Sequence, residues 1–234
     1  MSLIKSTACS LAILSATSVS ALASTVDIRV IGTISPVACV PSLSGGGTID
    51  YGTIHPTTMH ATDYTVLPEK TTELSITCDA PAKVAIQSSS GRKGSLAGAT
   101  EYYYGNAVLP VTVFGANDVA GVGLGWNANA PTEKIGGVAF TVEPSSVSVD
   151  GNAADVIGGT INGTWYHNPR HHDLFSYRWS RELTFAAPGT LVPMEFTTAT
   201  ATVKAQAYLN KRSELDLSKP VALDGLISLE LRYL

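Results

Sequence analysis

Apolar and polar side chains alternate along most of this chain. Successive residues of a strand point to opposite faces, so this alternation is typical of half-buried β-strands. It appears first in residues 24–34. One face of that segment carries four aliphatic residues and a glycine: Val26, Ile28, Val30, Gly32 and Ile34. The pattern predicts a strand here.

Short segments rich in β-branched residues follow, separated by clusters of turn-forming residues. The predicted strands are residues 48–54, 73–79, 83–88, 109–115, 137–150, 194–209 and 225–234. No segment has apolar residues at helical spacing over three turns together with a helix-capping residue. Regular strands and turns with so little helix predict an all-β fold, an antiparallel sandwich. Because no linker or repeat divides the chain, we expect a single domain.

The last predicted strand alternates as strongly as the first. Its apolar face carries Ile227, Leu229, Leu231 and Tyr233. An unpaired strand edge promotes aggregation, so each terminal strand is expected to have a partner. Either the two terminal strands pair within one molecule, or each pairs with a different molecule.

Residues 1–23 have the features of a secretory signal peptide. Lys5 precedes an apolar stretch at residues 8–19, and Ala21-Leu22-Ala23 forms a small-x-small cleavage pattern. A membrane anchor is the alternative, but the apolar run is short and contains many Ser and Thr residues. We therefore expect cleavage after Ala23 and an exported, soluble mature chain.

Export changes the number of cysteines that matter. Cys9 lies in the predicted signal peptide, so the mature chain keeps Cys39 and Cys78. In an oxidising compartment an even pair favours a disulfide. Its loop of about forty residues would stabilise the fold by roughly 4 kcal/mol in the chain-entropy model. A metal site is the alternative, but two cysteines without CxxC spacing argue against it.

Charged residues make up only 15% of the chain. Without Lys5, fourteen basic residues face nineteen acidic ones, a net charge of about −5, and no basic stripe is present. This argues against nucleic acid or an anionic membrane as a partner. Motifs of nucleophilic, zinc and phosphate chemistry are missing, and the glycines of residues 120–125 do not match GxGxxG. We expect no enzyme and no cofactor.

Two groups of side chains are candidates for ligand binding. The densest metal-capable set is His167, His171, His172 and Asp173, which suits zinc. Pro169 breaks the helix that would bring the histidines together, so a polar surface loop without metal is expected. Aromatic residues could stack on sugar rings, although they are also ordinary core residues. The aromatic candidates are residues 101–106, Trp126, Trp165 and Trp179.

Together, the first strand, the cysteine pair and the last strand resemble subunits of chaperone–usher fimbriae, the pilin-like proteins of Gram-negative surface fibres. In those subunits an alternating N-terminal extension with a glycine runs into a first strand that ends in a cysteine, as residues 26–39 do here. Their final strand has a penultimate tyrosine, which Tyr233 matches. The segments "GTISPVAC", "SGGGTIDYGTI", "LSITCDAPAKVAI" and "LELRYL" also resemble an uncharacterised branch of exported proteins found near fimbrial genes.

The resemblance implies an immunoglobulin-like β-sandwich that lacks its last strand, with a signal peptide at 1–23, a donor-strand extension at 24–31 and a pilin-like domain at 32–234. A periplasmic chaperone would pair with the final strand, at Ile227, Leu229, Leu231 and Tyr233. The donor strand of the next subunit would then replace the chaperone, through Val26, Ile28, Val30 and Gly32. An outer-membrane usher would assemble neighbouring subunits into a surface fimbria that supports adhesion and biofilm formation.

Two other functions stay open. A tip adhesin would bind a glycan through the aromatic or histidine residues, but such adhesins usually begin with a separate binding domain. A self-complete secreted sandwich, with or without a metal, would fold as a monomer and protect residues 24–31 within the same molecule. This chain departs from the fimbrial pattern in its greater length and in the position of Gly225, which lies closer to the end than the corresponding glycine.

Overall fold

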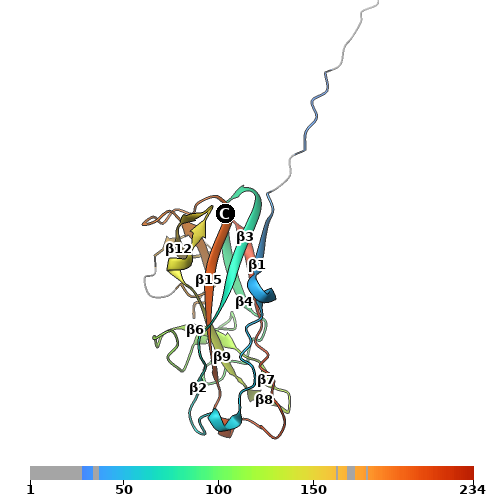
Figure 1. Cartoon of the computed structure of the whole chain (residues 1–234), viewed down its shortest axis with the longest axis vertical. Coiled ribbons are helices and arrows are strands. Elements are labelled where there is room, and N and C mark those ends of the chain that lie inside the picture. The colour runs from blue at the N-terminus through green and yellow to red at the C-terminus, as the bar shows by residue number, and fades with distance from the viewer. Residues whose placement is uncertain (1–27, 34–36, 162, 168–171, 178) are drawn as a thin grey trace, which may run out of the picture. The chain divides into compact units, whose positions relative to one another are not determined.

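The computed structural model describes residues 28–33, 37–161, 163–167, 172–177 and 179–234 (Figure 1). The chain divides into two units, residues 1–35 and residues 36–234. The described residues contain strands and short 3-10 turns but no α-helix, and none of their helices is long and apolar enough to cross a membrane. The predicted all-β class is confirmed.

The strands vary from two-residue pairs to strands of more than twelve residues. They are β1 (Cys39–Leu43), β2 (Thr65–Val66), β3 (Lys70–Ala82), β4 (Val84–Ser90), β5 (Ala107–Val108), β6 (Ala120–Gly123), β7 (Trp126–Asn127), β8 (Ala130–Lys134), β9 (Gly136–Val142), β10 (Ser148–Val149), β11 (Asn152–Ala153), β12 (Asp155–Thr160), β13 (Trp165–Tyr166), β14 (Arg181–Ala186), β15 (Phe196–Leu209) and β16 (Ile227–Tyr233). The 3-10 turns are η1 (Ser44–Gly47), η2 (Pro56–Thr58), η3 (Pro144–Ser146) and η4 (Arg212–Glu214).

Two large antiparallel sheets pack face to face, and β7 pairs with β8 in a separate two-stranded sheet. The larger sheet has the order β1-β3-β15-β9-β6-β5, with β2 and β10 also pairing with β15. The smaller sheet has the order β13-β12-β14-β4-β16. Buried side chains from both sheets form one core, which includes Ile76 of β3, Ile86 of β4 and Phe185 of β14. The arrangement is consistent with the predicted antiparallel β-sandwich.

The predicted cysteine pair is a disulfide between Cys39 and Cys78. The two residues lie directly opposite each other in the β1–β3 ladder. The bond therefore fixes the start of β1, a strand of five residues that pairs on one side only among the described residues.

A third layer covers part of the outer face of the larger sheet. Residues 96–119 supply a second cluster, with Leu96, Leu109 and Val113 packed around the fully buried Tyr208 of β15. The Tyr208 hydroxyl donates a hydrogen bond to the Ala97 carbonyl, and burial raises the pKa of this phenol. This layer supports β15, the strand that forms part of the floor of the site described below.

Besides residues 24–34, of which the described residues 28–33 form no strand, three predicted strands differ from the structure. Residues 109–115 form turns with one isolated bridge at Val113, because this segment packs as part of the third layer instead of joining a sheet. Residues 48–54 are extended but join no ladder. Residues 137–150 divide into β9, η3 and β10, since Pro144 interrupts the ladder.

Candidate functional site

Two strand edges on the same side of the sandwich have no partner strand among the described residues. β1 pairs only with β3, and β16 pairs only with β4. The edges meet at one end, where the Cys39 N–H donates a hydrogen bond of 2.8 Å to the Tyr233 Oη. Each edge therefore presents backbone N–H and C=O groups that another strand can pair with.

An apolar cavity of about 560 Å³ opens between these edges; we call it the sheet lobe. Its walls include Leu43 of β1 and Ile227 and Leu229 of β16, which are only half-buried. Its floor is the inner face of the larger sheet, formed by Leu74, Val138, Phe140, Val203 and Ala205. None of the residues that line the sheet lobe carries a charge.

A small side chain of β15 lies on the floor of this space. The inward-facing positions of β15 alternate along the strand, and four of them are alanines: Ala199, Ala201, Ala205 and Ala207. Ala205 is the one among them that lines the sheet lobe, beside Val203. Because protein cores normally reach the packing density of organic crystals, a side chain from an additional strand could fill the space above Ala205.

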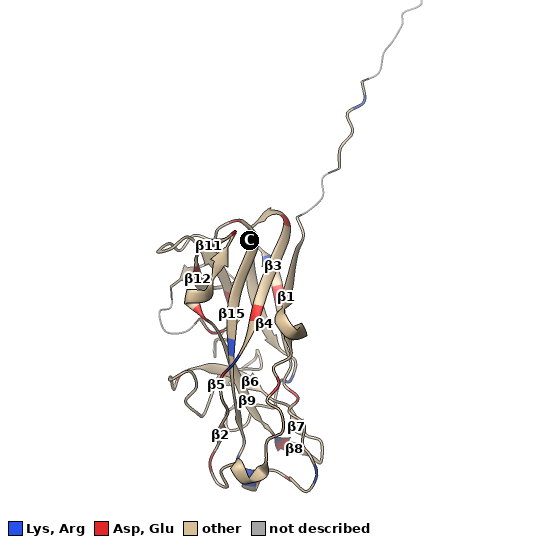
Figure 2. Ribbon diagram, viewed as in Figure 1, with Lys and Arg blue, Asp and Glu red and all other residues tan. Residues whose placement is uncertain are grey.

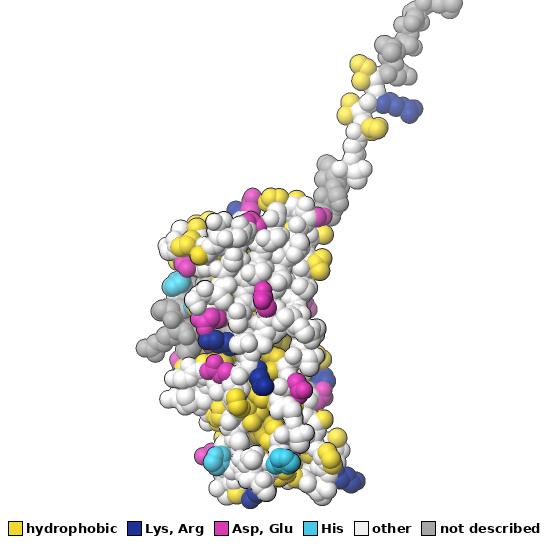
Figure 3. All heavy atoms as spheres, in the orientation of Figure 1, with side chains coloured by type: hydrophobic (Ala, Val, Ile, Leu, Met, Phe, Trp, Pro, Cys, Tyr) yellow, Lys and Arg dark blue, Asp and Glu magenta, His cyan; other side chains and the backbone are white. Residues whose placement is uncertain are grey.

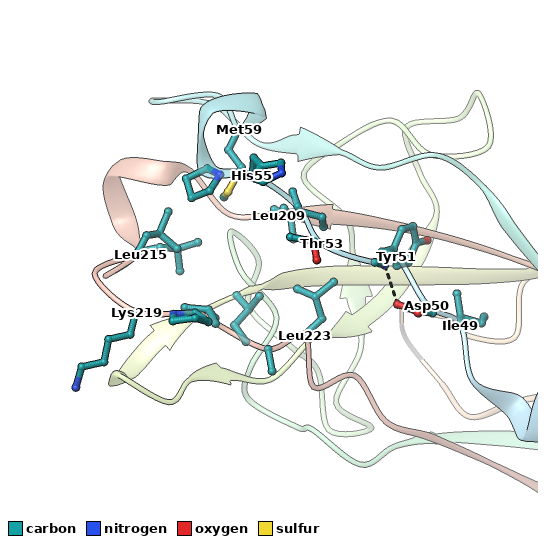
Figure 4. A pocket seen from close by; sticks show the side chains of 18 of the residues that line it. Ile49, Asp50, Tyr51, Thr53, His55, Met59, Leu209, Leu215, Lys219 and Leu223 are labelled. Carbon is teal, nitrogen blue, oxygen red and sulfur yellow. Dashed lines mark hydrogen bonds between the residues drawn. The ribbon is translucent and has the colours of Figure 1, made fainter.

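A second cavity of about 710 Å³ continues beyond the ends of β1 and β16; we call it the loop lobe. Its walls are residues 48–56 on one side and residues 215–223 on the other, with Ile135 and Leu209 between them. Figure 4 shows Leu215 and Leu223 facing Leu209 and Met59 across this space, while the Lys219 side chain points outward. Ile49, Tyr51 and Leu223 line both lobes, so the two lobes form one continuous groove.

Specific hydrogen bonds hold the two walls of the loop lobe. The Tyr51 hydroxyl accepts a bond of 3.2 Å from the Ala207 N–H, and burial raises the pKa of this phenol. On the other wall, Glu133 accepts a bond of 2.6 Å from the Asp216 N–H, and Arg92 pairs with Asp224 at 2.6 Å. The groove is therefore built into the fold instead of being a gap between mobile loops.

Charged side chains are scattered over the described surface. The face in Figures 2 and 3 shows isolated acidic and basic residues, with no broad patch of one sign among the described residues. Since the sheet lobe is also uncharged, the groove suits a ligand that presents apolar side chains and a backbone to pair with.

The predicted donor segment is described in part. Residues 28–33 form no strand, and Ile28, Val30 and Ile31 are 89%, 94% and 90% exposed. Gly32 is exposed, and no atom lies within 4 Å of the position its Cβ would take. Val26 lies outside the described residues.

The four apolar residues of the last strand do not all line the cavity. Ile227 and Leu229 line the sheet lobe, and Leu231 packs against the core at half burial. Tyr233 is 47% exposed and joins β16 to β1 at the closed end of the groove. The structure thus brings these four residues to one edge but places only the first two in the cavity wall.

The histidine candidates are brought together only in part: the exposed His167 and the buried His172 have ring centroids 6.0 Å apart. His172 and Asp173 are buried, where the His172 carbonyl accepts a hydrogen bond from Val142 of β9; His171 lies outside the described residues. No group of three or more His, Cys, Asp or Glu residues in the described part of the chain is placed to hold a metal ion. The aromatic candidates do not form one surface either: Trp165 packs on Gly159, whereas Tyr102–Tyr104 lie on an exposed turn.

Most of the groove wall is not predictable from the pattern of apolar and polar residues. Residues 48–56 and 215–223 form no ladder, so periodicity gives no sign that they face each other. One signal was available: the alternate alanines in residues 199–207 indicate a central strand with unusual space above it.

Comparisons with known proteins place the chain among poorly characterised relatives. Residues 28–139 match the model of a family described as "Protein of unknown function (DUF1120)". The chain is 27% identical to Protein GltF of Escherichia coli (strain K12) over 227 residues, which covers 89% of this chain and 88% of GltF. It is 22% identical over 219 residues to Uncharacterized protein YhcF of the same strain, covering 89% and 90% of the two chains. No solved structure matches. The chain is thus a distant relative of GltF and YhcF over most of its length, and its first half resembles a family of unknown function.

Proposed function

We propose that this protein is a structural subunit of a surface fimbria and that copies or related subunits join by β-strand addition. The groove of one subunit takes the N-terminal segment of its neighbour, with Val26, Ile28 and Val30 pointing into the cavity. Gly32 occupies a point where the groove is too shallow for a β-carbon. The fibre then supports adhesion and biofilm formation.

One observation carries this proposal. Two unpaired strand edges flank a continuous apolar groove, and the same chain exposes an alternating apolar segment. Strand addition uses both features, since main-chain hydrogen bonds supply affinity and alternate side chains supply specificity. An isolated sandwich would instead leave a long apolar groove in contact with water, which is an aggregation hazard.

The donor segment is expected to run antiparallel to β16. Every ladder in the smaller sheet is antiparallel. The Cys39–Tyr233 hydrogen bond closes one end of the groove, whereas the loop lobe leaves the other end open. An antiparallel donor begins beside Tyr233 and leaves through the loop lobe toward its own domain.

Apolar contacts supply part of the affinity of this association. Burial of one aliphatic side chain contributes roughly 1.5–3 kcal/mol, so three contribute about 5–9 kcal/mol before the cost of ordering the segment. Backbone hydrogen bonds to the free edges of β1 and β16 add to this, because those groups otherwise bond only to water.

The proposal includes the partners and location that such assembly needs. A periplasmic chaperone covers the groove before assembly, an outer-membrane usher assembles the subunits, and neighbouring subunits complete the fold. The chain is exported through the periplasm of a Gram-negative bacterium to its surface, and it has no enzymatic activity, cofactor or nucleic-acid partner. The Cys39–Cys78 disulfide supports an oxidising compartment.

The test is peptide complementation. A variant lacking residues 24–31 is mixed with a synthetic peptide of residues 24–35, and thermal unfolding is followed. We expect a large rise in melting temperature, because the peptide restores the missing strand. If the truncated variant folds only when the peptide is present, the result supports the proposal equally.

Adjacent aliphatic residues of the peptide give a matched control. Val30→Asp places a charge on the face that enters the groove and should abolish the rise in melting temperature. Ile31→Asp is the same substitution on the opposite face and should preserve most of it. A truncated variant that is stable alone and ignores the peptide would falsify strand addition and leave the self-complete sandwich in its place.

A further inference from the structure

The outer face of the smaller sheet carries a cluster of exposed apolar side chains. Ile161, Val192 and Leu234 are 58%, 68% and 43% exposed. Together with Trp165 and Pro193 they surround a shallow depression of about 360 Å³. We call these five residues the outer patch. Clusters of this kind on soluble proteins mark interaction surfaces.

An ion pair stabilises the floor of the outer patch. Arg232 lines the depression and forms a two-point contact with Glu182, whose side chain is fully buried. These hydrogen bonds raise the pKa of Arg232. Lys83 also lines the depression, and its Nζ lies 4.0 Å from an oxygen of Glu195. Since both cations have a carboxylate partner, the patch does not require an acidic partner, and its exposed rim suits an apolar one.

The outer patch lies beside the point where the N-terminal segment joins the domain. The Leu234 N–H bonds to the Lys83 carbonyl, and the preceding residue, Tyr233, accepts a hydrogen bond from Cys39. Residues 33–38 are all that separates the proposed donor residues from Cys39. Six extended residues span at most about 20 Å.

We propose that the outer patch is a second contact between consecutive copies of this chain. This inference rests on the proposed function: when the donor segment occupies a neighbour's groove, the short connection keeps Cys39 of the donor copy, and with it the end of the domain that carries Leu234, close to that groove. An antiparallel donor leaves through the loop lobe, so the outer patch of the donor copy meets the loop-lobe end of the acceptor copy. This contact is heterologous and repeats along an open chain.

The test separates the patch from the groove. Val192→Asp and Ile161→Asp are made in the mature chain, and the concentration for half-maximal assembly is measured by sedimentation velocity. We expect each variant to raise that concentration about tenfold or more, because a charge is placed in a buried apolar contact. Binding of the peptide of residues 24–35 to truncated forms of the same variants should be unchanged.

Tyr103→Asp is the matched control, because Tyr103 is 88% exposed and is not part of the outer patch. If the patch variants assemble as Tyr103→Asp does, the inference is wrong while the proposed function stands. If the peptide fails to bind even the unsubstituted truncated chain, the proposed function fails first.

A cross-linking measurement tests the orientation of the contact. One copy carries Val192→Cys and the other Ser218→Cys, at an exposed position on the loop-lobe wall. A short bis-maleimide should link the two into a covalent dimer, and a Val192→Cys with Tyr103→Cys mixture should not link. Equal linking in both mixtures, or none in either, would contradict the head-to-tail contact.

Discussion

Tyr233 and the Cys39–Cys78 disulfide hold the closed end of the groove from its two sides. The alternation of the last strand predicted that Tyr233 shares a face with Ile227, Leu229 and Leu231. The disulfide was predicted because an exported chain keeps an even pair of cysteines in an oxidising compartment. The hydrogen bond from Cys39 to Tyr233 was not predictable, because it depends on the two sheet edges approaching each other at that end. A single hydroxyl thus links β1 and β16 at that end.

Replacing Tyr233 with Phe removes this hydroxyl and keeps the ring. The Cys39 N–H then loses its partner, and we expect the free energy of unfolding to fall by about 1 kcal/mol. Urea denaturation of the mature chain measures the change. Ser228→Ala, on the opposite face of β16, is the control; equal effects from both substitutions would contradict a specific role for the hydroxyl.

His172 makes stability depend on pH. Burial lowers the pKa of its imidazole, and His167 and Arg181 lower it further, whereas Asp155 and Glu143 raise it. The unfolded chain therefore binds a proton near the ordinary pKa of 6.5 while the folded chain resists it. The stability gained from the neutral imidazole is complete above about pH 6.5 and is lost as pH falls through the lowered folded pKa.

The measurement is the free energy of unfolding between pH 7 and pH 5, at constant salt. We expect it to decrease toward low pH, and His172→Gln should flatten this decrease. The exposed His60 supplies the control, since His60→Gln should leave the profile unchanged. A profile that His172→Gln does not alter would contradict this assignment.

At the scale of elements, alternation predicted β3, β15 and β16 but missed β12 and β14, which pair with each other and are buried at nearly every position instead of alternating. β3, β15 and β16 are strongly periodic because one face of each lies against the core. Residues 109–115 have the β-branched composition of a strand, yet they turn over the outer face of the larger sheet. Composition alone does not distinguish a strand from an extended segment that packs on a sheet.

Enlarging an alanine of β15 should increase the stability of the free chain and weaken its binding of the peptide. Ala205 lies on the floor of the sheet lobe, so Ala205→Leu places a side chain where a donor residue would enter. We expect the free truncated chain to gain about 0.5–2 kcal/mol of stability from the filled space. The same variant should bind the peptide of residues 24–35 at least tenfold more weakly.

Thermal unfolding and peptide titration measure these two effects on one preparation. Ala139→Leu is the contrasting control, because Ala139 faces the third layer on the outer side of the larger sheet. It should destabilise the chain by overpacking and should not selectively weaken peptide binding. Loss of both stability and binding in Ala205→Leu would mean that the sheet lobe is not open space.

At the scale of the whole molecule, the fold keeps an apolar groove open, and Ile28 and Val30 of the N-terminal segment are exposed. The sandwich, the disulfide and the last strand were predictable, because each depends on local alternation or on a residue pair. It did not predict the loop lobe, whose walls become neighbours only after the sheets pack. Assembly by strand addition thus depends on whether an added strand pairs with β16.

Hydrogen–deuterium exchange along β16 tests this most directly. The variant lacking residues 24–31 is measured alone and with the peptide of residues 24–35. We predict that alternate amides of residues 227–233, those not bonded to β4, exchange at least tenfold more slowly when the peptide is bound. Unchanged exchange along β16 despite peptide binding, or protection of residues 28–32 in the dilute monomeric full chain, would contradict the account.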